Sequence, residues 1–271
     1  MIWLNGKLVD DADAAVPALD HGLTVGDGVF ESLRTYRGEP FAVRRHLDRL
    51  ERSAKGLGIG VPPRQHLEQA IREVVAAAGS GDWRVRLTVT GGPGPLGSGR
   101  TEGMPTVIAA VSELEPVPPT TAVITVPWVR NERSPLAGLK TTSYAENVVA
   151  LARARESGAS EALLANTQGE LCEGTGTNVF LVHDGRLVTP PLSSGCLAGV
   201  TRELVLEICE GDEERVPFDA LAQADEVFIT SSIREVQAVE LLDGRSLQAP
   251  GPFTVAARNA YRALLARTLD P

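Results

Sequence analysis

Apolar and polar residues alternate over several short segments in the first half of the chain, the pattern of half-buried β-strands. An Asn5-Gly6 turn between two such segments predicts a hairpin. Elsewhere apolar residues recur every three or four positions, which predicts amphipathic helices. The expected strands cover residues 2–9, 28–36, 40–44, 83–92 and 105–112, and the expected helices cover residues 45–58 and 62–78.

The second half combines short strands with a helix shortly after residue 140. Thr141, Thr142 and Ser143 are typical helix-capping residues. The strands after this helix are separated by glycine-containing turns, so we expect a meander and not a βαβ series. The half-buried face of the helix is expected to contain Val148, Val149, Leu151 and Ala152. The expected strands cover residues 122–128, 161–167, 169–174, 177–182, 186–191 and 225–230, and the later helices cover residues 200–210 and 254–269.

A proline-rich segment divides the chain near its middle. Three prolines stand within residues 116–119, and such a composition is typical of a linker. We therefore expect an N-terminal α/β domain over residues 1–112, a linker over residues 113–120 and a C-terminal α/β domain over residues 121–271. A chain of 271 residues is long enough for two such hydrophobic cores.

The overall charge narrows the classes of partner. A net charge of -9 and a pI near 5.1 argue against nucleic acid or an anionic membrane surface, because no basic stripe stands out to neutralise phosphates. No apolar run of 18 residues is present, so we expect a cytoplasmic protein with no membrane partner. The three cysteines, Cys172, Cys196 and Cys209, follow no metal or disulfide pattern and are expected to be reduced thiols.

Lysine is scarce, because the chain has only Lys7, Lys55 and Lys140. Lys140 stands just before the expected helix of the second half, where a cation faces the positive end of the helix dipole at a cost of about 0.3 to 1 kcal/mol. One interpretation is an amine held for covalent chemistry with a carbonyl group. The other is a solvated lysine beside a loop, and this stretch alone leaves both open.

Three other features of the second half could bind one ligand. Glu173 lies in an apolar, small-residue setting and would need a positive partner if buried, yet no neighbouring base in the sequence supplies one. Val200 and Thr201 open a helix whose unpaired amides suit a phosphate, and residues 230–232 add hydroxyl donors. Together with Lys140, these features match what pyridoxal 5'-phosphate (PLP) requires.

The chain resembles the class IV aminotransferases of PLP fold type IV, a family that includes branched-chain and D-amino-acid aminotransferases and aminodeoxychorismate lyase. The resemblance covers nearly the whole chain, and its motifs occur in the family's order. These motifs are DHGLTVGDGVFESLRTY, RHLDRL, GLKTTSYAENVVALARA, ELCEGTGTNVF, PPLSSGCLAGVTRELV and ADEVFITSSIREVQAV. The resemblance implies an α/β (α+β) fold of two domains with the cofactor between them, and a homodimer.

The resemblance also implies roles for individual residues. Lys140 corresponds to the Schiff-base lysine that also shuttles protons, and Glu173 to the acid that keeps the pyridine nitrogen protonated. Arg49 resembles the phosphate-binding arginine, and Leu197 resembles the residue packed on the ring. The other expected cofactor contacts are Tyr144, Val200, Thr201, Ser231 and Ser232.

The strand over residues 28–36 is where members of this family differ in substrate. Phe30, Ser32 and Arg34 share one face of it, because side chains alternate along a strand. Arg34 is a candidate for a substrate carboxylate, and Ser32 resembles the lyases. We therefore expect 4-amino-4-deoxychorismate lyase, which makes 4-aminobenzoate and pyruvate for folate synthesis. The alternative is an aminotransferase for branched-chain L- or D-amino acids with a 2-oxo acid acceptor. Against the lyase, the segment GGPGPLGSGR lacks an arginine at the point where some lyases have one, although Arg100 nearby could serve.

Overall fold

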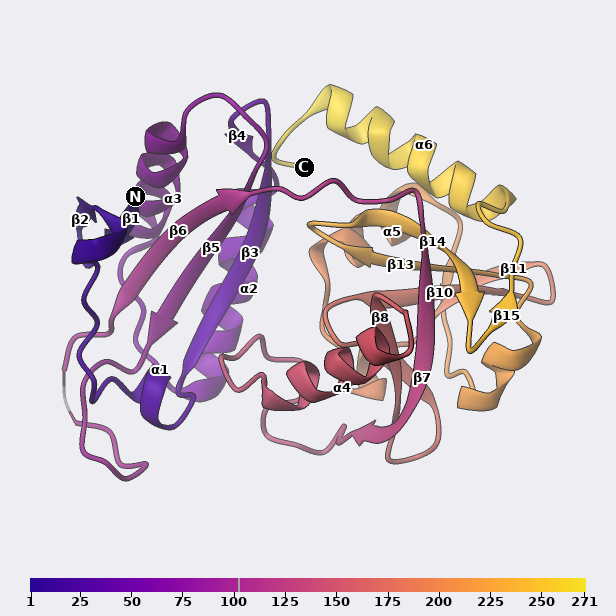
Figure 1. Cartoon of the computed structure of the whole chain (residues 1–271), viewed down its shortest axis with the longest axis horizontal. Helices are drawn as coiled ribbons and strands as arrows, with labels where there is room; N and C mark the ends of the chain where they lie inside the picture. Colours follow the sequence, from indigo (N-terminus) through magenta and orange to yellow (C-terminus); the bar gives the residue numbers. More distant parts are fainter. Residues whose placement is uncertain (102) are drawn as a thin grey trace. The chain divides into compact units, whose positions relative to one another are not determined.

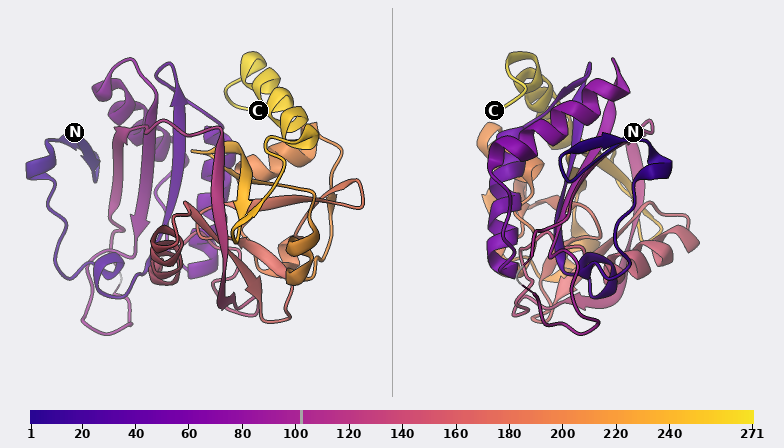
Figure 2. Two further views of the ribbon diagram at one scale, coloured as in Figure 1. Left: turned by 45° about the vertical axis from the view of Figure 1, so that its right-hand side comes forward. Right: turned by 90° about the vertical axis from the view of Figure 1, so that its left-hand side faces the viewer.

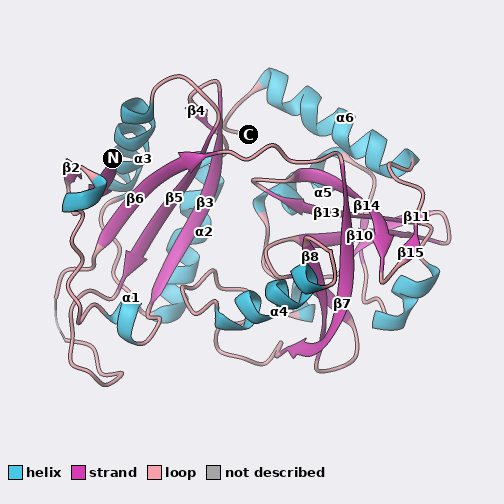
Figure 3. Ribbon diagram, in the orientation of Figure 1, coloured by secondary structure: helices cyan, strands magenta, loops and turns pink. Residues whose placement is uncertain are grey.

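The computed structural model describes residues 1–101 and 103–271. It contains two compact units, whose strands and helices are coloured in Figure 3. The first unit consists of Met1–Glu115, Leu139–Tyr144 and Leu269–Pro271, and the second of Pro116–Gly138 and Ala145–Thr268. The domain boundaries expected from the proline-rich segment stay a prediction. Among the described residues, no helix has both the length and the apolar character needed to cross a membrane.

The first unit is built on an antiparallel sheet of six strands in the order β2-β1-β6-β5-β3-β4. Helices α2 and α3 pack on this sheet, as the right-hand view of Figure 2 shows. The strands are β1 (Ile2–Leu4), β2 (Lys7–Val9), β3 (Gly28–Tyr36), β4 (Glu39–Pro40), β5 (Trp83–Thr90) and β6 (Val107–Glu113). The helices are η1 (Asp11–Asp13), α1 (His21–Thr24), α2 (Val43–Leu57) and α3 (Arg64–Ala78).

The hydrophobic core of this unit lies between the sheet and the two long helices. Leu47 and Leu50 of α2 and Leu67 of α3 are fully buried there, opposite Leu33 and Leu87 of the sheet. The three-to-four spacing of these leucines gives each helix one apolar face, as the sequence predicts. Helix α2 ends at Leu57, where Gly58 adopts the left-handed conformation that suits a C-terminal glycine.

The second unit contains a curled sheet of nine strands in the order β12-β11-β10-β13-β14-β7-β8-β9, with β15 paired to β14. Helices α5 and α6 pack together beside β13 and β14 (Figure 1). The strands are β7 (Thr120–Arg130), β8 (Glu161–Asn166), β9 (Leu171–Gly174), β10 (Asn178–His183), β11 (Arg186–Thr189), β12 (Asp212–Glu213), β13 (Glu226–Ser231), β14 (Glu235–Leu242) and β15 (Arg245–Ser246). The helices are α4 (Ala145–Glu156), η2 (Leu192–Ser194), α5 (Val200–Ile208), η3 (Phe218–Gln223) and α6 (Pro252–Arg267).

The structure corrects three expectations for individual elements. The expected strand over residues 40–44 is only β4, because the chain already begins α2 at Val43. The expected meander of the strands after α4 is interrupted, because β9 and β10 are not paired. Before it, β7 and β8 are parallel neighbours joined through α4, which is a βαβ unit that the sequence did not predict. The mixed α/β fold expected from the sequence is confirmed.

The third correction concerns the buried face of α4. Its buried residues are Asn147, Ala150 and Ala154, whereas Val148 and Val149 are 63% and 54% exposed. Small alanines permit close packing of α4 on β7 and β8, so the larger valines point away from the unit. The expected apolar face of this helix is therefore wrong.

Candidate active site

Lys140 lies in an extended segment that pairs with the start of β3 in the first unit. The Phe30 amide donates to the Lys140 carbonyl at 3.1 Å, and the Thr142 amide donates to the Gly28 carbonyl at 2.8 Å. Since these backbone groups are paired with a strand, residues 140–142 do not join a helix, and α4 begins only at Ala145. The expectation that a helix capped by residues 141–143 begins directly after Lys140 is therefore wrong.

Helix α2 fixes the same segment from its other side. The Lys140 amide donates to Ser53 Oγ at 3.1 Å. A Cβ atom at Gly56 would lie 2.7 Å from a methyl group of Leu139, so this glycine permits the close approach of the segment. The backbone of Lys140 is thus held by two elements of the first unit, as a reactive side chain requires.

The Lys140 side chain lies against two aromatic rings. Its Nζ is 3.4 Å from the Tyr144 hydroxyl and 4.4 Å from the centre of the Phe30 ring. The two rings meet edge to face with their centres 5.1 Å apart. Phe30, Lys140 and Tyr144, named separately from the sequence, are therefore brought together. Aromatic faces attract a cation and exclude water, so the amine has an apolar and partly shielded environment.

Arg86 is a cation of this region that the sequence reading did not select. Its guanidinium lies 3.7 Å above the Phe30 ring, and it stands opposite Ser32 on the neighbouring strand β5. Arg34, the expected carboxylate ligand, instead stacks on Tyr36 and pairs with Asp82 at 3.4 Å. The alternation of arginine with apolar residues in β5 was the available signal for Arg86.

Arg49 belongs to a buried network behind this face of the sheet. Its Nε and Nη2 donate to the two carboxylate oxygens of Glu31 at 2.8 and 2.6 Å, and His46 Nδ1 lies 2.7 Å from the same carboxylate. Burial alone would raise the pKa of Glu31, but the charge and hydrogen bonds of Arg49 and the contact with His46 lower it to about 2. Glu31 therefore holds the Arg49 guanidinium in one orientation, while the phosphate role expected for Arg49 stays a prediction.

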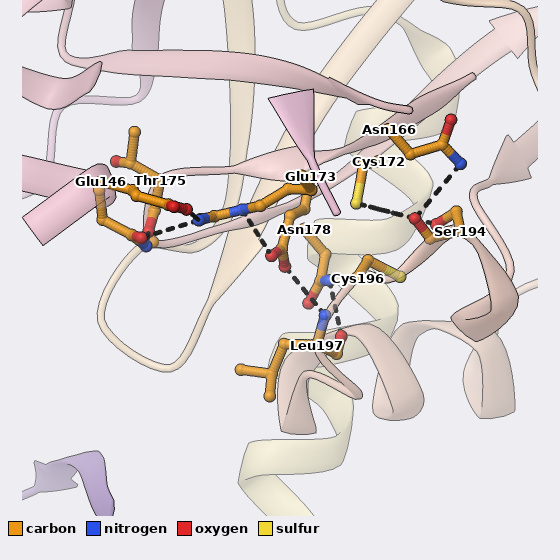
Figure 4. Close-up of polar contacts among 12 residues, drawn as sticks. Glu146, Asn166, Cys172, Glu173, Thr175, Asn178, Ser194, Cys196 and Leu197 are labelled. Atoms are coloured by element: carbon orange, nitrogen blue, oxygen red, sulfur yellow. Dashed lines mark hydrogen bonds and ion pairs between the residues drawn. The ribbon is translucent and has the colours of Figure 1, made fainter. Parts of the chain in front are cut away.

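In the second unit, Glu173 has the positive partner that no neighbouring residue in the sequence supplies. Arg130 Nε lies 3.4 Å from Glu173 Oε1, and the Leu197 amide donates to Oε2 at 2.9 Å. The Leu197 carbonyl accepts from Asn178 Nδ2 at 2.8 Å, as the dashed lines in Figure 4 trace. Glu173 and Leu197, both expected at the cofactor, are thus directly bonded.

Two irregularities in the sheet lie beside Arg130 and Glu173. The register shifts between β7 and β8: Thr125 pairs with Leu163, but Val129, four residues later, pairs with Ala165, only two residues later. A second shift separates β8 from β9 next to the Glu173 pairing. Such bulges re-aim side chains and are common beside active sites. They also explain why Arg130, 43 positions before Glu173, was not found from the sequence.

The start of helix α5 provides donors for an anion. Its N-cap, Gly199, has no side chain, and no side-chain cap is present, so the first amides of the helix lack that kind of partner. Thr201 is buried in the first turn. Strand β13 packs on α5, and its Thr230 Oγ1 is buried without a hydrogen-bond partner in the structure. An amide cluster with hydroxyl groups nearby suits a phosphate.

An arginine holds the end of β13, where Ser231 is the last strand residue and Ser232 begins the following turn. The Arg234 amide donates to Ser231 Oγ at 3.1 Å, and its guanidinium donates to the Ser160 carbonyl at 2.8 Å and to Gln237 at 2.6 Å. The two serines thus lie where β13 passes into a turn that Arg234 fixes, and their expected contacts with phosphate stay predictions.

The thiols of Cys172 and Cys196 donate to backbone carbonyls, Cys172 to that of Ser194 at 3.3 Å and Cys196 to that of Pro191 at 3.5 Å. All three cysteines are free, and burial raises the pKa of the Cys196 thiol to about 11 and that of Cys172 further. These two are therefore uncharged thiols at neutral pH. Within the described residues, no group of three or more histidine, cysteine or acidic side chains could hold a metal ion.

The sequence model of the family described as amino-transferase class IV matches residues 28–242. The chain belongs to this family. A putative branched-chain-amino-acid aminotransferase of Methanocaldococcus jannaschii is 36% identical over 90% of this chain and 88% of its own length. Aminodeoxychorismate lyase of Bacillus subtilis is 31% identical over 87% of this chain and 84% of its own length.

Solved structures are also similar throughout. The branched-chain aminotransferase of the archaeon Thermoproteus uzoniensis, crystallised with norvaline, has a TM-score of 0.91 and 32% identity, and the match covers 98% of this chain and 95% of that one. The PLP-bound form of a hypothetical aminotransferase from Mycobacterium tuberculosis has a TM-score of 0.86 and 25% identity, over 99% of this chain and 100% of that one. This class IV aminotransferase is therefore a PLP-dependent enzyme of fold type IV.

The residues of this class IV aminotransferase fit the cofactor. Lys140 offers an amine among aromatic rings, and Glu173 offers a carboxylate joined to Leu197. The α5 terminus offers amides without a side-chain cap, near the unbonded Thr230 hydroxyl. These are the groups that an aldehyde, a pyridine nitrogen and a phosphate need. Lys140 belongs to the first unit, whereas Glu173, Leu197 and the start of α5 belong to the second.

Proposed function

We propose that this class IV aminotransferase transfers the amino group between a branched-chain L-amino acid and a 2-oxo acid. The observation that carries the proposal is the pairing of Phe30 with Arg86 beside Lys140. An aromatic face suits a branched aliphatic side chain, whereas a guanidinium suits the second carboxylate of glutamate or 2-oxoglutarate. An aminotransferase must accept both kinds of side chain in turn.

Each residue is assigned a task within its own unit. Lys140 carries the cofactor and moves the proton at the substrate Cα, and the Tyr144 hydroxyl at 3.4 Å orients its amine. Glu173 holds the proton at the pyridine nitrogen, and Leu197 supports the ring. Arg49, Val200, Thr201, Ser231 and Ser232 are proposed phosphate ligands. PLP, when bound, supplies the electron sink that stabilises a carbanion at Cα.

The lyase expected from Ser32 is supported less well. Arg100, the arginine that this interpretation would use for a substrate carboxylate, donates to both oxygens of Asp27 and to the Gly58 carbonyl at 3.0 Å. Among the relatives compared above, the branched-chain aminotransferase has the higher identity. An amino-group transfer is therefore the better supported reading.

The assembly and location of the enzyme are also proposals. A homodimer is supported by the two exposed valines on α4, Val148 and Val149, which a second copy of the chain could cover. A cytoplasmic location is supported by the acidic composition and the unpaired cysteines.

The test is a substrate panel with the purified, PLP-loaded enzyme. Leucine, isoleucine and valine in both L and D forms are each supplied with 2-oxoglutarate or pyruvate, and the new amino acid is measured by chromatography. We expect turnover of the L forms with 2-oxoglutarate. D forms reacting faster would reverse the stereochemical proposal. Release of 4-aminobenzoate and pyruvate from 4-amino-4-deoxychorismate without any 2-oxo acid would establish the lyase instead.

The Arg86→Gln variant tests the observation on which the proposal rests. If Arg86 binds the second carboxylate, the KM for 2-oxoglutarate rises about tenfold or more, while the KM for leucine changes little. Arg84→Gln is the matched control, because Arg84 is an exposed arginine on the same strand. Equal changes for both substrates would contradict this role for Arg86.

A further inference from the structure

We infer that Asn147 and Arg130 form a positioning relay that fixes the Glu173 carboxylate. Arg130 Nη1 donates to Asn147 Oδ1 at 2.9 Å, while its Nε faces Glu173 Oε1 at 3.4 Å. The same guanidinium thus connects a buried amide on α4 with a carboxylate on β9. This inference rests on the proposed role of Glu173 at the cofactor, but not on the choice of amino acid substrate.

Asn147 is itself fixed from its other end. Its Nδ2 donates to the Thr175 carbonyl, in the turn that follows Glu173. Arginine can only donate and a carbonyl can only accept, so both contacts of Asn147 are satisfied with the amide in one orientation. A side chain at this position must therefore offer one acceptor and one donor. Aspartate, leucine and alanine would each lose at least one of these contacts.

The turn that receives Asn147 is anchored by a second buried acid. Glu161 accepts from the amide and hydroxyl of Thr175 and, at 3.0 Å, from the hydroxyl of Thr177. The turn whose Thr175 carbonyl accepts from Asn147 is therefore itself held by hydrogen bonds to Glu161. Asn147 and Glu161 are both buried, so water does not compete for these contacts.

Glu146, the residue before Asn147, offers the same guanidinium a different partner. Its carboxylate lies 3.6 Å from Arg130 Nη1, but its side chain is 83% exposed. An exposed ion pair of this kind contributes little. Glu146 therefore makes a control that touches the same arginine and changes a charge without entering the buried relay.

The charged and titratable groups around Glu173 and its partner Arg130 come from several elements. Arg130 ends β7, Glu146 lies in the first turn of α4, Cys172 precedes Glu173 on β9, and Cys196 precedes Leu197. Arg130 is the cation among them, and the thiols are uncharged at neutral pH because burial raises their pKa values. A displaced guanidinium would therefore change the field at the Glu173 carboxylate.

The experiment follows the visible absorbance of the bound cofactor as pH is varied, in the PLP-loaded enzyme without substrate. The variants are Asn147→Ala, Arg130→Gln, Arg130→Lys and the control Glu146→Gln. The quantity compared is the titration midpoint, the pH at which half of the absorbance change has occurred. We expect Asn147→Ala and Arg130→Gln to shift this midpoint in the same direction by about half a pH unit or more. Glu146→Gln is expected to leave it in place.

Two further comparisons separate positioning from charge or simple destabilisation. Arg130→Lys keeps the charge but has one ammonium group, which cannot reach both Asn147 and Glu173, so we expect the shift to persist. In a Glu173→Gln background, Asn147→Ala is expected to cause no further shift, because the relay then has no carboxylate to position.

Several results would overturn the relay. A wild-type midpoint in Arg130→Lys would show that charge alone matters. An undiminished Asn147→Ala shift in the Glu173→Gln background would show that Asn147 acts by another route. If Asn147→Ala does not fold, the Arg130 series still decides between these outcomes. Failure of the substrate panel would leave this titration unaffected, so the two proposals fail separately.

Discussion

Each unit of the chain contains an arginine paired with a glutamate, and the two pairs differ in burial. Glu31 and Arg49 of the first unit are 0% and 6% exposed, and two short hydrogen bonds and His46 complete the network. Glu173 and Arg130 of the second unit are 14% and 15% exposed and meet at a single distance of 3.4 Å. In the first pair both carboxylate oxygens accept hydrogen bonds from the buried arginine, whereas in the second pair both side chains are partly exposed.

The difference in burial indicates that one arginine–glutamate pair is structural and that the other is placed to meet a ligand. A buried carboxylate that accepts two donors from one guanidinium fixes that guanidinium, and the pair acts mainly on the stability and orientation of its surroundings. A partly exposed carboxylate at a sheet irregularity is placed to meet a ligand. We therefore expect mutations of Glu31 to affect stability and mutations of Glu173 to affect catalysis.

The largest expected effect is on stability at Glu31. Glu31→Gln preserves shape but leaves the buried Arg49 without its counter-charge, so the free energy of unfolding should fall by about 3–5 kcal/mol. Glu173→Gln should lower it by less than Glu31→Gln does, because Arg130 keeps its hydrogen bond to Asn147 and its contact with the exposed Glu146. Urea unfolding of the two variants measures both values. Equal losses would mean that the two pairs do not differ in the way their burial suggests.

The second effect is the acid sensitivity of the Glu31 pair. Its folded-state pKa of about 2 lies below the ordinary value of 4.5, so its contribution is complete above pH 4.5 and is lost as pH falls toward 2. A shift of this size corresponds to about 3 kcal/mol. Burial also lowers the pKa of His46, so stability should begin to fall below pH 6.5.

Unfolding curves measured between pH 7 and 2.5 check this dependence. Glu31→Gln removes the component between pH 4.5 and 2 while retaining a histidine at position 46. If the wild type and this variant lost stability in parallel over that range, the carboxylate would not be held ionised by Arg49.

The third effect is catalytic and belongs to Glu173. Glu173→Gln should lower kcat by about 10²-fold, since an amide cannot supply the negative charge that holds a proton at the ring nitrogen. Steady-state rates with leucine and 2-oxoglutarate give this value. Glu240→Gln, an exposed acid on β14, is the control. A kcat within twofold of wild type would remove Glu173 from the proposed machinery.

The sequence predicted best what depends on local pattern. The hairpin at Asn5-Gly6, helices α2, α3, α5 and α6 and the short strands follow from periodicity and turn residues, and the structure has them. Motif resemblance named Lys140 and Tyr144 for the cofactor and Phe30 for the substrate, and the structure shows that the three side chains are in contact.

What the sequence missed depends on contacts between distant segments. The segment around Lys140 is extended because β3 supplies its hydrogen bonds, and capping residues alone could not reveal that partner. Arg130 reaches Glu173 only through register shifts in the sheet, which leave no periodic signal. The alanine-lined face of α4 was missed because the larger valines dominate a hydrophobicity pattern.

The smallest expected effect concerns a third pair, Arg34 with Asp82, which lies at the edge of the first unit with Asp82 46% exposed. Asp82→Asn retains an acceptor for the Arg37 amide but weakens the attraction on Arg34, so stability should change by less than about 1 kcal/mol. The variant also tests the substrate role expected for Arg34. If Arg34 binds a substrate carboxylate, loosening it from Asp82 should change the KM for 2-oxoglutarate; if Arg86 alone does so, the KM stays within about twofold of wild type. Because Arg86 contacts Phe30 beside Lys140 and Arg34 stacks on Tyr36 further along the strand, we expect the second outcome.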